Sequence, residues 1–221
     1  MRGRFITFEG GEGSGKSTHA KRLAEKLKDS GIEVVLTREP GGSPGAEIIR
    51  HILLSGAAKP LGAETETILF AAARDDHVRQ VIRPALVAGK WVICDRFIDS
   101  TRVYQGVLGN VDQKLIRGLE RVTVGAAMPD LTFILDVPAN VGLARATRRR
   151  KGATADRFES ETVEFHEALR HAYKADADSE PKRIVIIDGR PPRDIVSERI
   201  WMTVKERLKP EKARVAESAT P

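Results

Sequence analysis

The stretch Gly10-Gly11-Glu12-Gly13-Ser14-Gly15-Lys16-Ser17-Thr18 decides how this chain folds, because it matches the pattern G-x-x-x-x-G-K-[ST] of a phosphate-binding loop. The apolar run before it (5–8) predicts a buried strand, and apolar residues at helical spacing after it predict a helix over 16–30. A glycine-rich turn that matches by chance is the alternative, and this strand–loop–helix context argues against it. We expect Lys16 to bind the β- and γ-phosphates of a nucleotide and Ser17 to bind Mg²⁺.

The composition is that of one globular domain. The chain has 221 residues, of which 41% are hydrophobic and 31% charged. No apolar run approaches the roughly 20 residues of a membrane span, and the short N-terminus leaves no room for a signal peptide, so we expect no membrane contact. The single cysteine, Cys94, agrees with a reducing cytoplasm, and its apolar run predicts a buried side chain. The net charge of +6 permits nucleic-acid binding without establishing it.

Strands and helices alternate along the chain. The apolar runs predict strands over 5–8, 33–37, 89–94, 131–137 and 183–188. Helical spacing and caps predict helices over 16–30, 44–54, 63–81, 112–126, 139–151, 160–177 and 193–208, the third of which bends or ends before Pro84. Such alternation predicts a parallel sheet with helices on both faces, so we expect a single domain over 1–208 and a disordered tail over 209–221.

Charged residues follow several of the predicted strands, at the edge where parallel sheets bind ligands. Arg38 comes after the second strand, Asp95 and Arg96 after the third, and Arg190 after the fifth. Asp95 is placed to support Mg²⁺ beside a phosphate loop, and the arginines to neutralise phosphates. The alternatives are an arginine on a solvated turn for Arg38 and a buried structural ion pair for Asp95 and Arg96.

Phe70 and Arg74 lie four residues apart and so share one face of the predicted helix 63–81. A phenyl ring can stack on a nucleotide base while a guanidinium donates hydrogen bonds to a carbonyl of that base. Spacing alone favours a plainer interpretation, in which Phe70 is part of the core and Arg74 lies on the surface.

The densest run of positive charge ends the predicted helix 139–151. It contains Arg145, Arg148, Arg149, Arg150 and Lys151, and small residues at 152–155 and then Asp156-Arg157 follow it. This composition predicts a lid, over about 145–158, that closes on phosphates. A solvated face or a nucleic-acid patch is the alternative, although the run lacks the interleaved aromatic residues of single-strand binders.

Taken together, these motifs resemble the thymidylate kinases of bacteria. The segments that carry the resemblance are Phe8-Glu9-Gly10 through Thr18, Thr37-Arg38-Glu39-Pro40-Gly41-Gly42, Phe70 with Arg74, Asp95-Arg96-Phe97, Ser100-Thr101 with Tyr104-Gln105-Gly106, and Asp156-Arg157. The resemblance covers about 4–208. It implies a P-loop NTPase-type fold of five parallel strands with a short basic lid, a homodimer, and the transfer of phosphate from ATP to thymidine monophosphate with Mg²⁺, a step in dTTP synthesis for DNA replication.

The resemblance also assigns roles to residues that hold the acceptor nucleotide. It implies that Arg38 and Arg96 clamp the acceptor phosphate, that Phe70 lies under thymine, and that Arg74 donates to thymine O4, a contact that cytosine could not accept. Tyr104 would crowd the 2′ position of the sugar. The other expected substrate contacts are Glu12 near the 3′-hydroxyl, Pro40, Ser100, Thr101 and Gln105.

The remaining expected sites concern ATP and catalysis. We expect ATP to contact loop 10–18, Arg145 and Arg190, and we expect Ser17 and Asp95 to hold Mg²⁺. The expected catalytic residues are Lys16, Asp95, Arg96, Arg149, Arg150 and Arg157. Some relatives carry an arginine within the phosphate loop where this chain has Gly13, so the chain resembles the type whose catalytic cations lie in the lid.

Two other functions are weighed against this one. A kinase for another small nucleotide would share the phosphate loop, but it would not need Phe70, Arg74 and Tyr104 together. A nucleic-acid-binding ATPase is suggested by the pI of about 9.6 and the arginine run, and it would bind DNA in a salt-sensitive way. We expect a small-molecule substrate and no nucleic-acid partner.

Overall fold

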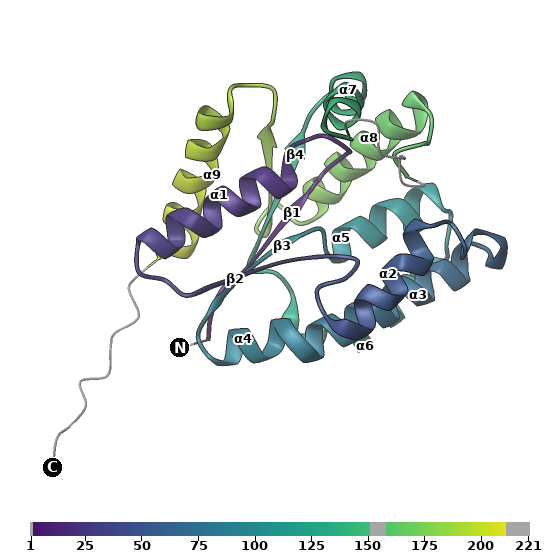
Figure 1. Cartoon of the computed structure of the whole chain (residues 1–221), viewed down its shortest axis with the longest axis horizontal. Helices are drawn as coiled ribbons and strands as arrows, with labels where there is room; N and C mark the ends of the chain where they lie inside the picture. The colour runs from purple at the N-terminus through teal and green to yellow at the C-terminus, as the bar shows by residue number, and fades with distance from the viewer. Residues whose placement is uncertain (1, 151–157, 211–221) are drawn as a thin grey trace, which may run out of the picture.

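A five-stranded parallel sheet forms the centre of the molecule (Figure 1). The computed structural model describes residues 2–150 and 158–210. The strands are β1 (Phe5–Glu9), β2 (Val34–Arg38), β3 (Trp91–Asp95), β4 (Leu131–Asp136) and β5 (Ile184–Asp188), in the order β2-β3-β1-β4-β5. The predicted five parallel strands are therefore confirmed, and β1, which leads into the phosphate loop, lies in the middle of the sheet.

Helices cover both faces of the sheet (Figure 1). Two helices, α1 (Lys16–Asp29) and α9 (Arg193–Leu208), pack on one face. The opposite face is covered by α4 (Arg83–Val87), α5 (Ile98–Thr101) and α8 (Val163–Ser179). The other α-helices are α2 (Pro44–Leu54), α3 (Ala63–His77), α6 (Gln113–Thr123) and α7 (Ala139–Arg150), and short 3₁₀ turns occupy Lys59–Leu61 and Gly125–Ala127.

The central strands are buried on both faces, which explains why they are apolar throughout rather than alternating. In β1, Ile6 and Phe8 join the core under α1 and α9, whereas Phe5 joins the core under α4 and α5. The lone Cys94 is fully buried in the second of these cores, as the sequence predicts. This packing on two faces fixes the direction of β1 and hence the position of the loop that follows it.

The helical segment before Pro84 differs from the prediction. We expected a helix over 63–81 that bends or ends before Pro84, but α3 continues through a π-helical turn (Val78–Ile82) into α4 and ends at Val87. Pro84 has no N–H to donate to the preceding turn, and the π-helical turn lies directly before it, where the backbone hydrogen-bond pattern already changes. A second π-helical segment, Arg102–Leu108, continues from α5, in a part of the chain for which no helix is predicted.

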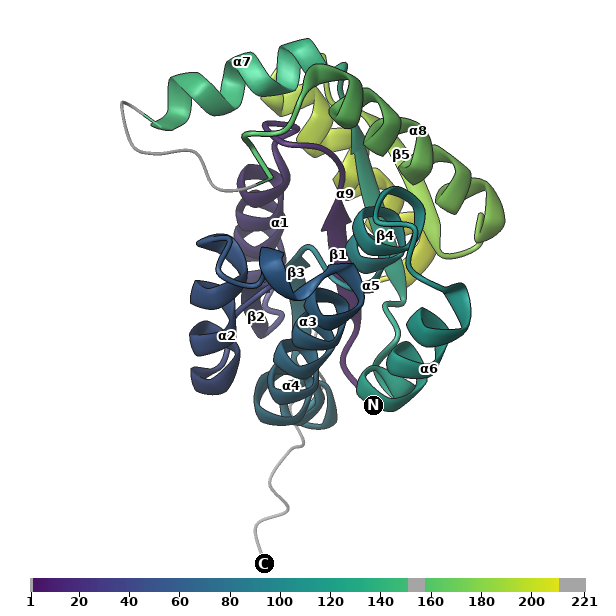
Figure 2. The ribbon, with the colours of Figure 1, turned by 90° about the vertical axis from the view of Figure 1, so that its right-hand side faces the viewer.

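The ends of the strands and α7 define where a ligand can enter. The phosphate loop, Arg38, Asp95 and Arg96 all lie at the carboxyl edge of the sheet, and α7 lies across that end of the molecule (Figure 2). Asp112 caps the N-terminus of α6, since its side chain accepts a hydrogen bond from the Lys114 N–H (2.8 Å). The predicted lid residues 151–157 and the tail residues 211–221 lie outside the described residues.

Candidate active site

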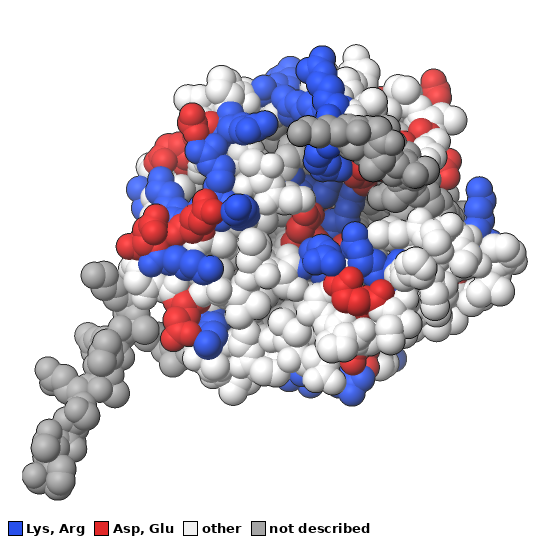
Figure 3. Space-filling model, in the orientation of Figure 1, with Lys and Arg blue, Asp and Glu red and all other residues white. Residues whose placement is uncertain are grey.

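A pocket of about 440 Å³ lies at the carboxyl edge of the sheet. Figure 3 shows Lys and Arg side chains, with acidic side chains among them, around a hollow on this face. All of the residues that we expected to bind substrate line this one pocket: Glu12, Arg38, Pro40, Phe70, Arg74, Arg96, Ser100, Thr101, Tyr104 and Gln105. They come from four stretches of the chain, at 12, 38–40, 70–74 and 96–105, and the fold brings them next to the phosphate loop.

The phosphate loop has the backbone geometry that its glycines allow. Gly13 and Gly15 have φ angles of 64° and 103°, which side-chain-bearing residues rarely adopt. The Lys16 ammonium donates to the carbonyl oxygens of Gly10 (3.0 Å) and Gly11 (2.8 Å). Burial, and next the charge of Arg96, lower the pKa of Lys16. The loop thus holds its cation beneath the place where phosphates would bind.

Glu12 and Arg96 form an ion pair inside the pocket. Burial by itself would raise the pKa of Glu12, but the charges of Arg96 and Lys16 outweigh it and lower the pKa to about 2. The Arg96 guanidinium also lies 5.2 Å from the centre of the Tyr104 ring. Arg96 has a φ of 69°, an uncommon value outside glycine, and its backbone N–H donates to Phe8 O (2.9 Å). The strand end therefore turns this arginine toward the loop.

The expected magnesium ligands lie side by side. The Ser17 hydroxyl donates to Asp95 Oδ2, and both residues line the pocket next to Lys16. Among the described residues, no three His, Cys, Asp or Glu side chains gather as a metal site. Magnesium commonly needs only one or two protein oxygens, because water and the substrate phosphates supply the rest. A hydroxyl beside a carboxylate fits this requirement.

Arg74 is buried rather than on the surface. Its Nε donates to Glu39 Oε2 (2.8 Å), and its Nη2 donates to Phe97 O (3.2 Å). His77 Nδ1 lies 3.0 Å from the other Glu39 oxygen. Because Arg74 is only 3% exposed and also lines the pocket, the plainer interpretation from spacing, with Arg74 on the surface, is wrong. Tertiary contacts decide this point, since helical spacing does not show what packs over a helix face.

Several expected residues lie elsewhere. Arg145 donates to Gly189 O (3.1 Å), and Arg190 pairs with its neighbour Asp188; neither lines the pocket. Arg149 does line it and pairs with Glu159 (3.0 Å). Arg150 ends α7, but its side chain is not described, and Arg157 lies outside the described residues.

The structure adds residues that the sequence prediction missed. Those that line the pocket are Glu39, Arg50, Leu54, Phe97, Phe158 and Glu159. Phe158 contributes an aromatic wall, with its ring 6.3 Å from that of Phe70 and 5.3 Å from that of Tyr104. Phe158 directly follows Asp156-Arg157, and Glu39 directly follows Arg38, so adjacency to predicted residues was the available signal.

The phosphate loop packs directly against α7. A Cβ atom at Gly13 would lie 1.9 Å from Gly142 O, and one at Gly142 would lie 2.3 Å from Glu12 O. Gly142 is buried in the interior of α7, where alanine would otherwise favour the helix. This close approach leaves no space for a side chain at position 13, such as the arginine that some relatives carry there.

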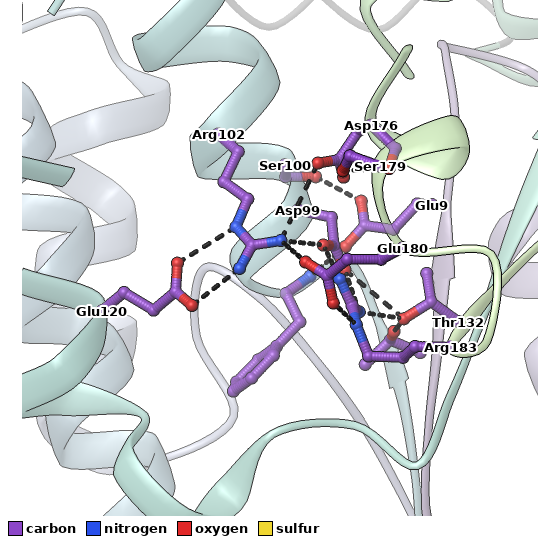
Figure 4. A network of polar contacts seen from close by, with 12 residues as sticks. Glu9, Asp99, Ser100, Arg102, Glu120, Thr132, Asp176, Ser179, Glu180 and Arg183 are labelled. Carbon is purple, nitrogen blue, oxygen red and sulfur yellow. Dashed lines mark hydrogen bonds and ion pairs between the residues drawn. The ribbon is translucent and has the colours of Figure 1, made fainter. Parts of the chain in front are cut away.

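A network of charges lies behind the site, between α5, α6, α8 and β5 (Figure 4). The fully buried Asp99 accepts two hydrogen bonds from Arg183 (2.6 and 2.9 Å). Arg102 donates twice to Glu120 (2.7 and 3.0 Å) and lies 3.8 Å from Asp176 Oδ1. Burial and the charge of Asp99 raise the pKa of Asp176 to about 7. This network anchors the helix that carries Ser100 and the helix that follows the lid.

Comparison with known proteins places this chain in a family. A family model described as thymidylate kinase matches residues 8–200. The chain belongs to the thymidylate kinase family. It is 62% identical over 207 residues to the thymidylate kinase of Afipia carboxidovorans, covering 94% of this chain and 91% of that one. With the thymidylate kinase of Nitrobacter winogradskyi it shares 58% identity over 220 residues, 100% of this chain and 94% of that one.

A solved structure agrees with this assignment. The crystal structure of thymidylate kinase from Ehrlichia chaffeensis is 33% identical in sequence and superposes with a TM-score of 0.75, over 92% of this chain and all of that one. As a thymidylate kinase family member, the chain is a nucleotide kinase that phosphorylates thymidine monophosphate, in the supply of dTTP for DNA replication. The family decides against the two other functions considered from the sequence. No helix in the described ranges is long and apolar enough to cross a membrane.

Proposed function

We propose that the pocket holds ATP at the phosphate loop and thymidine 5′-monophosphate in the part lined by Phe70, with the two phosphate chains facing each other. The observation that carries this proposal is the convergence of the predicted substrate residues on one pocket beside Lys16. The rings of Phe70, Tyr104 and Phe158 lie together at one part of the pocket, where a base can stack, and the charged side chains lie next to the loop. Such a division suits a reaction between two nucleotides.

The acceptor subsite consists of a base pocket and a phosphate clamp. Phe70 stacks on thymine, and Arg74, which Glu39 holds in place, donates to thymine O4. Arg38 and Arg96 bind the acceptor phosphate. Arg38 is now paired with Glu47 (2.9 Å) at the pocket wall and exchanges that partner for the phosphate. The other side chains that contact the acceptor are Glu12, Pro40, Ser100, Thr101, Tyr104 and Gln105.

The donor subsite is the phosphate loop, 10–18, with Lys16 on the β- and γ-phosphates. Arg145 and Arg190 contact ATP from outside the pocket, Arg145 from the middle of α7 and Arg190 from just after β5. Ser17 and Asp95 hold Mg²⁺, which neutralises charge on the phosphates when it is bound. The Asp95 carboxylate and the Ser17 hydroxyl lie together in the pocket, which supports this assignment.

The chemistry that these residues provide is positioning and charge stabilisation. An oxygen of the acceptor phosphate forms a bond to the γ-phosphorus of ATP, and the bond from that phosphorus to the ADP oxygen breaks. Because the attacking oxygen is already anionic, no strong general base is needed. Lys16, Arg96, Arg149 and the lid residues Arg150 and Arg157 stabilise the charge of the moving phosphoryl group.

A coupled assay of ADP release tests this proposal. Purified protein with ATP and Mg²⁺ is offered thymidine, uridine, cytidine and adenosine monophosphates in turn. Thymidine monophosphate gives much the highest kcat/KM, because thymine offers O4 to Arg74 and the pocket excludes a 2′-hydroxyl. Equal rates on all four nucleotides would overturn the assignment of the base pocket.

We also propose that the chain, as one domain over 1–208, works as a homodimer in the cytoplasm. Apolar side chains on the paired helices α2 and α3 support an interface, since Ile48, Ile52 and Ile68 are 68%, 37% and 47% exposed. Light scattering on a sizing column tests it. We expect the unaltered protein to have the mass of two chains and the Ile48→Lys variant to have the mass of one. If the unaltered protein has the mass of one chain, it is not a dimer.

A further inference from the structure

The hydroxyl group of Tyr173, on α8, lies directly behind the pocket. The side chain is fully buried, and its oxygen lies 2.9 Å from Ser100 Oγ, 3.1 Å from Glu9 Oε2 and 3.3 Å from Arg96 Nη1. A buried tyrosine hydroxyl usually forms a hydrogen bond, and any nearby backbone carbonyl could accept it. Here two of the three partners, Ser100 and Arg96, line the pocket themselves.

Glu9, Ser100 and Tyr173 form a triangle of oxygen atoms. The third side, from Ser100 Oγ to Glu9 Oε2, is 2.6 Å, and Glu9 Oε1 accepts from the Phe97 N–H (2.7 Å). Burial and the charge of Asp99 raise the pKa of Glu9 to about 8, so both of its protonation states are relevant near neutral pH. Burial raises the pKa of Tyr173, so its phenol keeps its proton.

Both states of Glu9 leave the hydroxyl oxygens free to accept from Arg96. When Glu9 is ionised, Ser100 and Tyr173 each donate to its Oε2. When Glu9 is protonated, it donates to Ser100, Ser100 donates to Tyr173, and Tyr173 donates back to Glu9. In each case the oxygen of Tyr173 keeps a lone pair for the Arg96 Nη1 group, which only donates.

Arg96 is consequently held from two sides. Glu12 pairs with Nη2 on the side of the phosphate loop. On the other side Nη1 lies 3.3 Å from Ser100 Oγ, Tyr173 Oη and Gly10 O. Of these three acceptor atoms, the Tyr173 oxygen belongs to α8, and Tyr173 follows Arg96 by 77 residues in the sequence.

We propose that Tyr173 is a positioning residue for the acceptor phosphate: through its hydroxyl group, shared with Ser100 and Glu9, it orients the Arg96 guanidinium that binds that phosphate. This inference rests on the proposed function of Arg96. If Tyr173 has this role, the orientation of the Arg96 guanidinium depends on the position of α8. The segment that leads into α8 lies at the pocket, since Phe158 contacts the Tyr104 ring and Glu159 pairs with Arg149.

Tyr173→Phe removes this hydroxyl and keeps the ring in the core. We expect KM for thymidine monophosphate to rise about fivefold, which corresponds to about 1 kcal/mol, while KM for ATP changes less than about twofold. Thr123→Val is the matched control, because it also removes a buried hydroxyl, bonded to Leu119 O (2.9 Å), but far from the pocket. The control keeps both KM values and shows what such a loss costs in thermal stability.

Binding measurements separate positioning from a structural role. Calorimetry compares thymidine monophosphate with thymidine, which lacks the phosphate. Tyr173→Phe weakens the nucleotide about fivefold and leaves the nucleoside unchanged. In an Arg96→Lys background the same change has no further effect on the nucleotide, because Tyr173 acts through the guanidinium.

Three results would overturn the inference: an unchanged KM for thymidine monophosphate in Tyr173→Phe, equal weakening of nucleotide and nucleoside, or an undiminished effect in the Arg96→Lys background. Turnover by the unaltered protein is measured first. Failure to use thymidine monophosphate at all would contradict the proposed function, whereas normal turnover with any of these three results would contradict only the role of Tyr173.

Discussion

Glu12 of the phosphate loop and Arg96 at the end of β3 form an ion pair that joins the two halves of the pocket. The two residues are 84 positions apart in sequence, and the pairing of β1 with β3 in the centre of the sheet brings them together. The pair holds the proposed acceptor clamp against the loop that we propose binds the donor. A change at either residue therefore affects how the two nucleotides meet.

Arg96→Lys keeps the positive charge at the proposed acceptor site but replaces the planar guanidinium by an ammonium group. The three donors of a lysine ammonium sit on one nitrogen and do not reproduce the planar spread by which the guanidinium reaches Glu12, Ser100 and the acceptor phosphate together, so we expect kcat/KM for thymidine monophosphate to fall about 100-fold. The coupled ADP-release assay measures it. Arg79→Lys, an exposed arginine paired with Asp75, is the control and keeps full activity. Retention of activity in Arg96→Lys would show that charge alone suffices.

Lys16→Met tests the phosphate loop. The substitution keeps the length of the buried side chain and removes the ammonium that the loop carbonyls hold. We expect turnover to fall about 1,000-fold, because the charge of the transferring phosphoryl group loses its nearest cation. Circular dichroism should show an unchanged fold, since the loss also relieves a buried charge. Turnover within tenfold of normal would remove Lys16 from the catalytic residues.

Arg74→Ala combines a loss of base recognition with a loss of stability. Removing Arg74 leaves Glu39 buried without its cation, which costs about 3 kcal/mol of unfolding free energy. The preference for thymidine over cytidine monophosphate should fall at least about tenfold. Arg74→Ala with Glu39→Gln recovers much of the stability, since no buried charge is then left unpaired, and the preference stays low. If the double variant regains the preference for thymidine monophosphate together with its stability, Arg74 does not recognise the base.

Asp176→Asn tests the charged network behind the site. The folded pKa of Asp176, about 7, lies above its ordinary value of 3.8, so the folded protein binds the proton more tightly than the unfolded chain. The stability from this proton is present below pH 3.8 and is lost as the pH rises through about 7. Asparagine carries no such proton. The variant should gain stability relative to the unaltered protein between pH 4 and pH 8, by on the order of 2 kcal/mol.

Urea unfolding at several pH values measures this difference. The amide also offers a donor to Asp99, and the Asp176 Oδ2 atom has no hydrogen-bond partner in the described structure. A stability difference that does not change with pH would show that Asp176 titrates at its ordinary value.

Gly142→Ala tests the contact between the phosphate loop and α7. Alanine would stabilise an ordinary helix interior by up to about 1 kcal/mol, but a Cβ at this position meets Glu12 O at 2.3 Å. We expect α7 and the loop to separate, with kcat/KM for ATP falling about tenfold or more. Gly118→Ala, on α6, is the control, since its Cβ would meet nothing within 4 Å. Normal activity in Gly142→Ala would show that the contact is dispensable.

The sequence predicted five strands that run parallel, because each strand is a short apolar run between helical patterns; it did not predict their order across the sheet. It also predicted that Arg38, Asp95 and Arg96 lie at one edge, since residues after parallel strands meet there, although Arg190, predicted in the same way, does not line the pocket. The helical path through Pro84 and the π-helical segment Arg102–Leu108 were not predicted, because π turns carry no distinct sequence pattern.

The phosphate loop, the alternation of strands and helices, and the family motifs were therefore determined by local sequence, through backbone freedom and the burial of apolar residues. Only the tertiary structure decided that Arg74 is buried against Glu39, that Gly13 faces Gly142, and that Tyr173 lies behind Arg96. The physical reason is distance along the chain. Each of these contacts joins segments far apart in sequence, and their geometry depends on how the helices pack on the finished sheet.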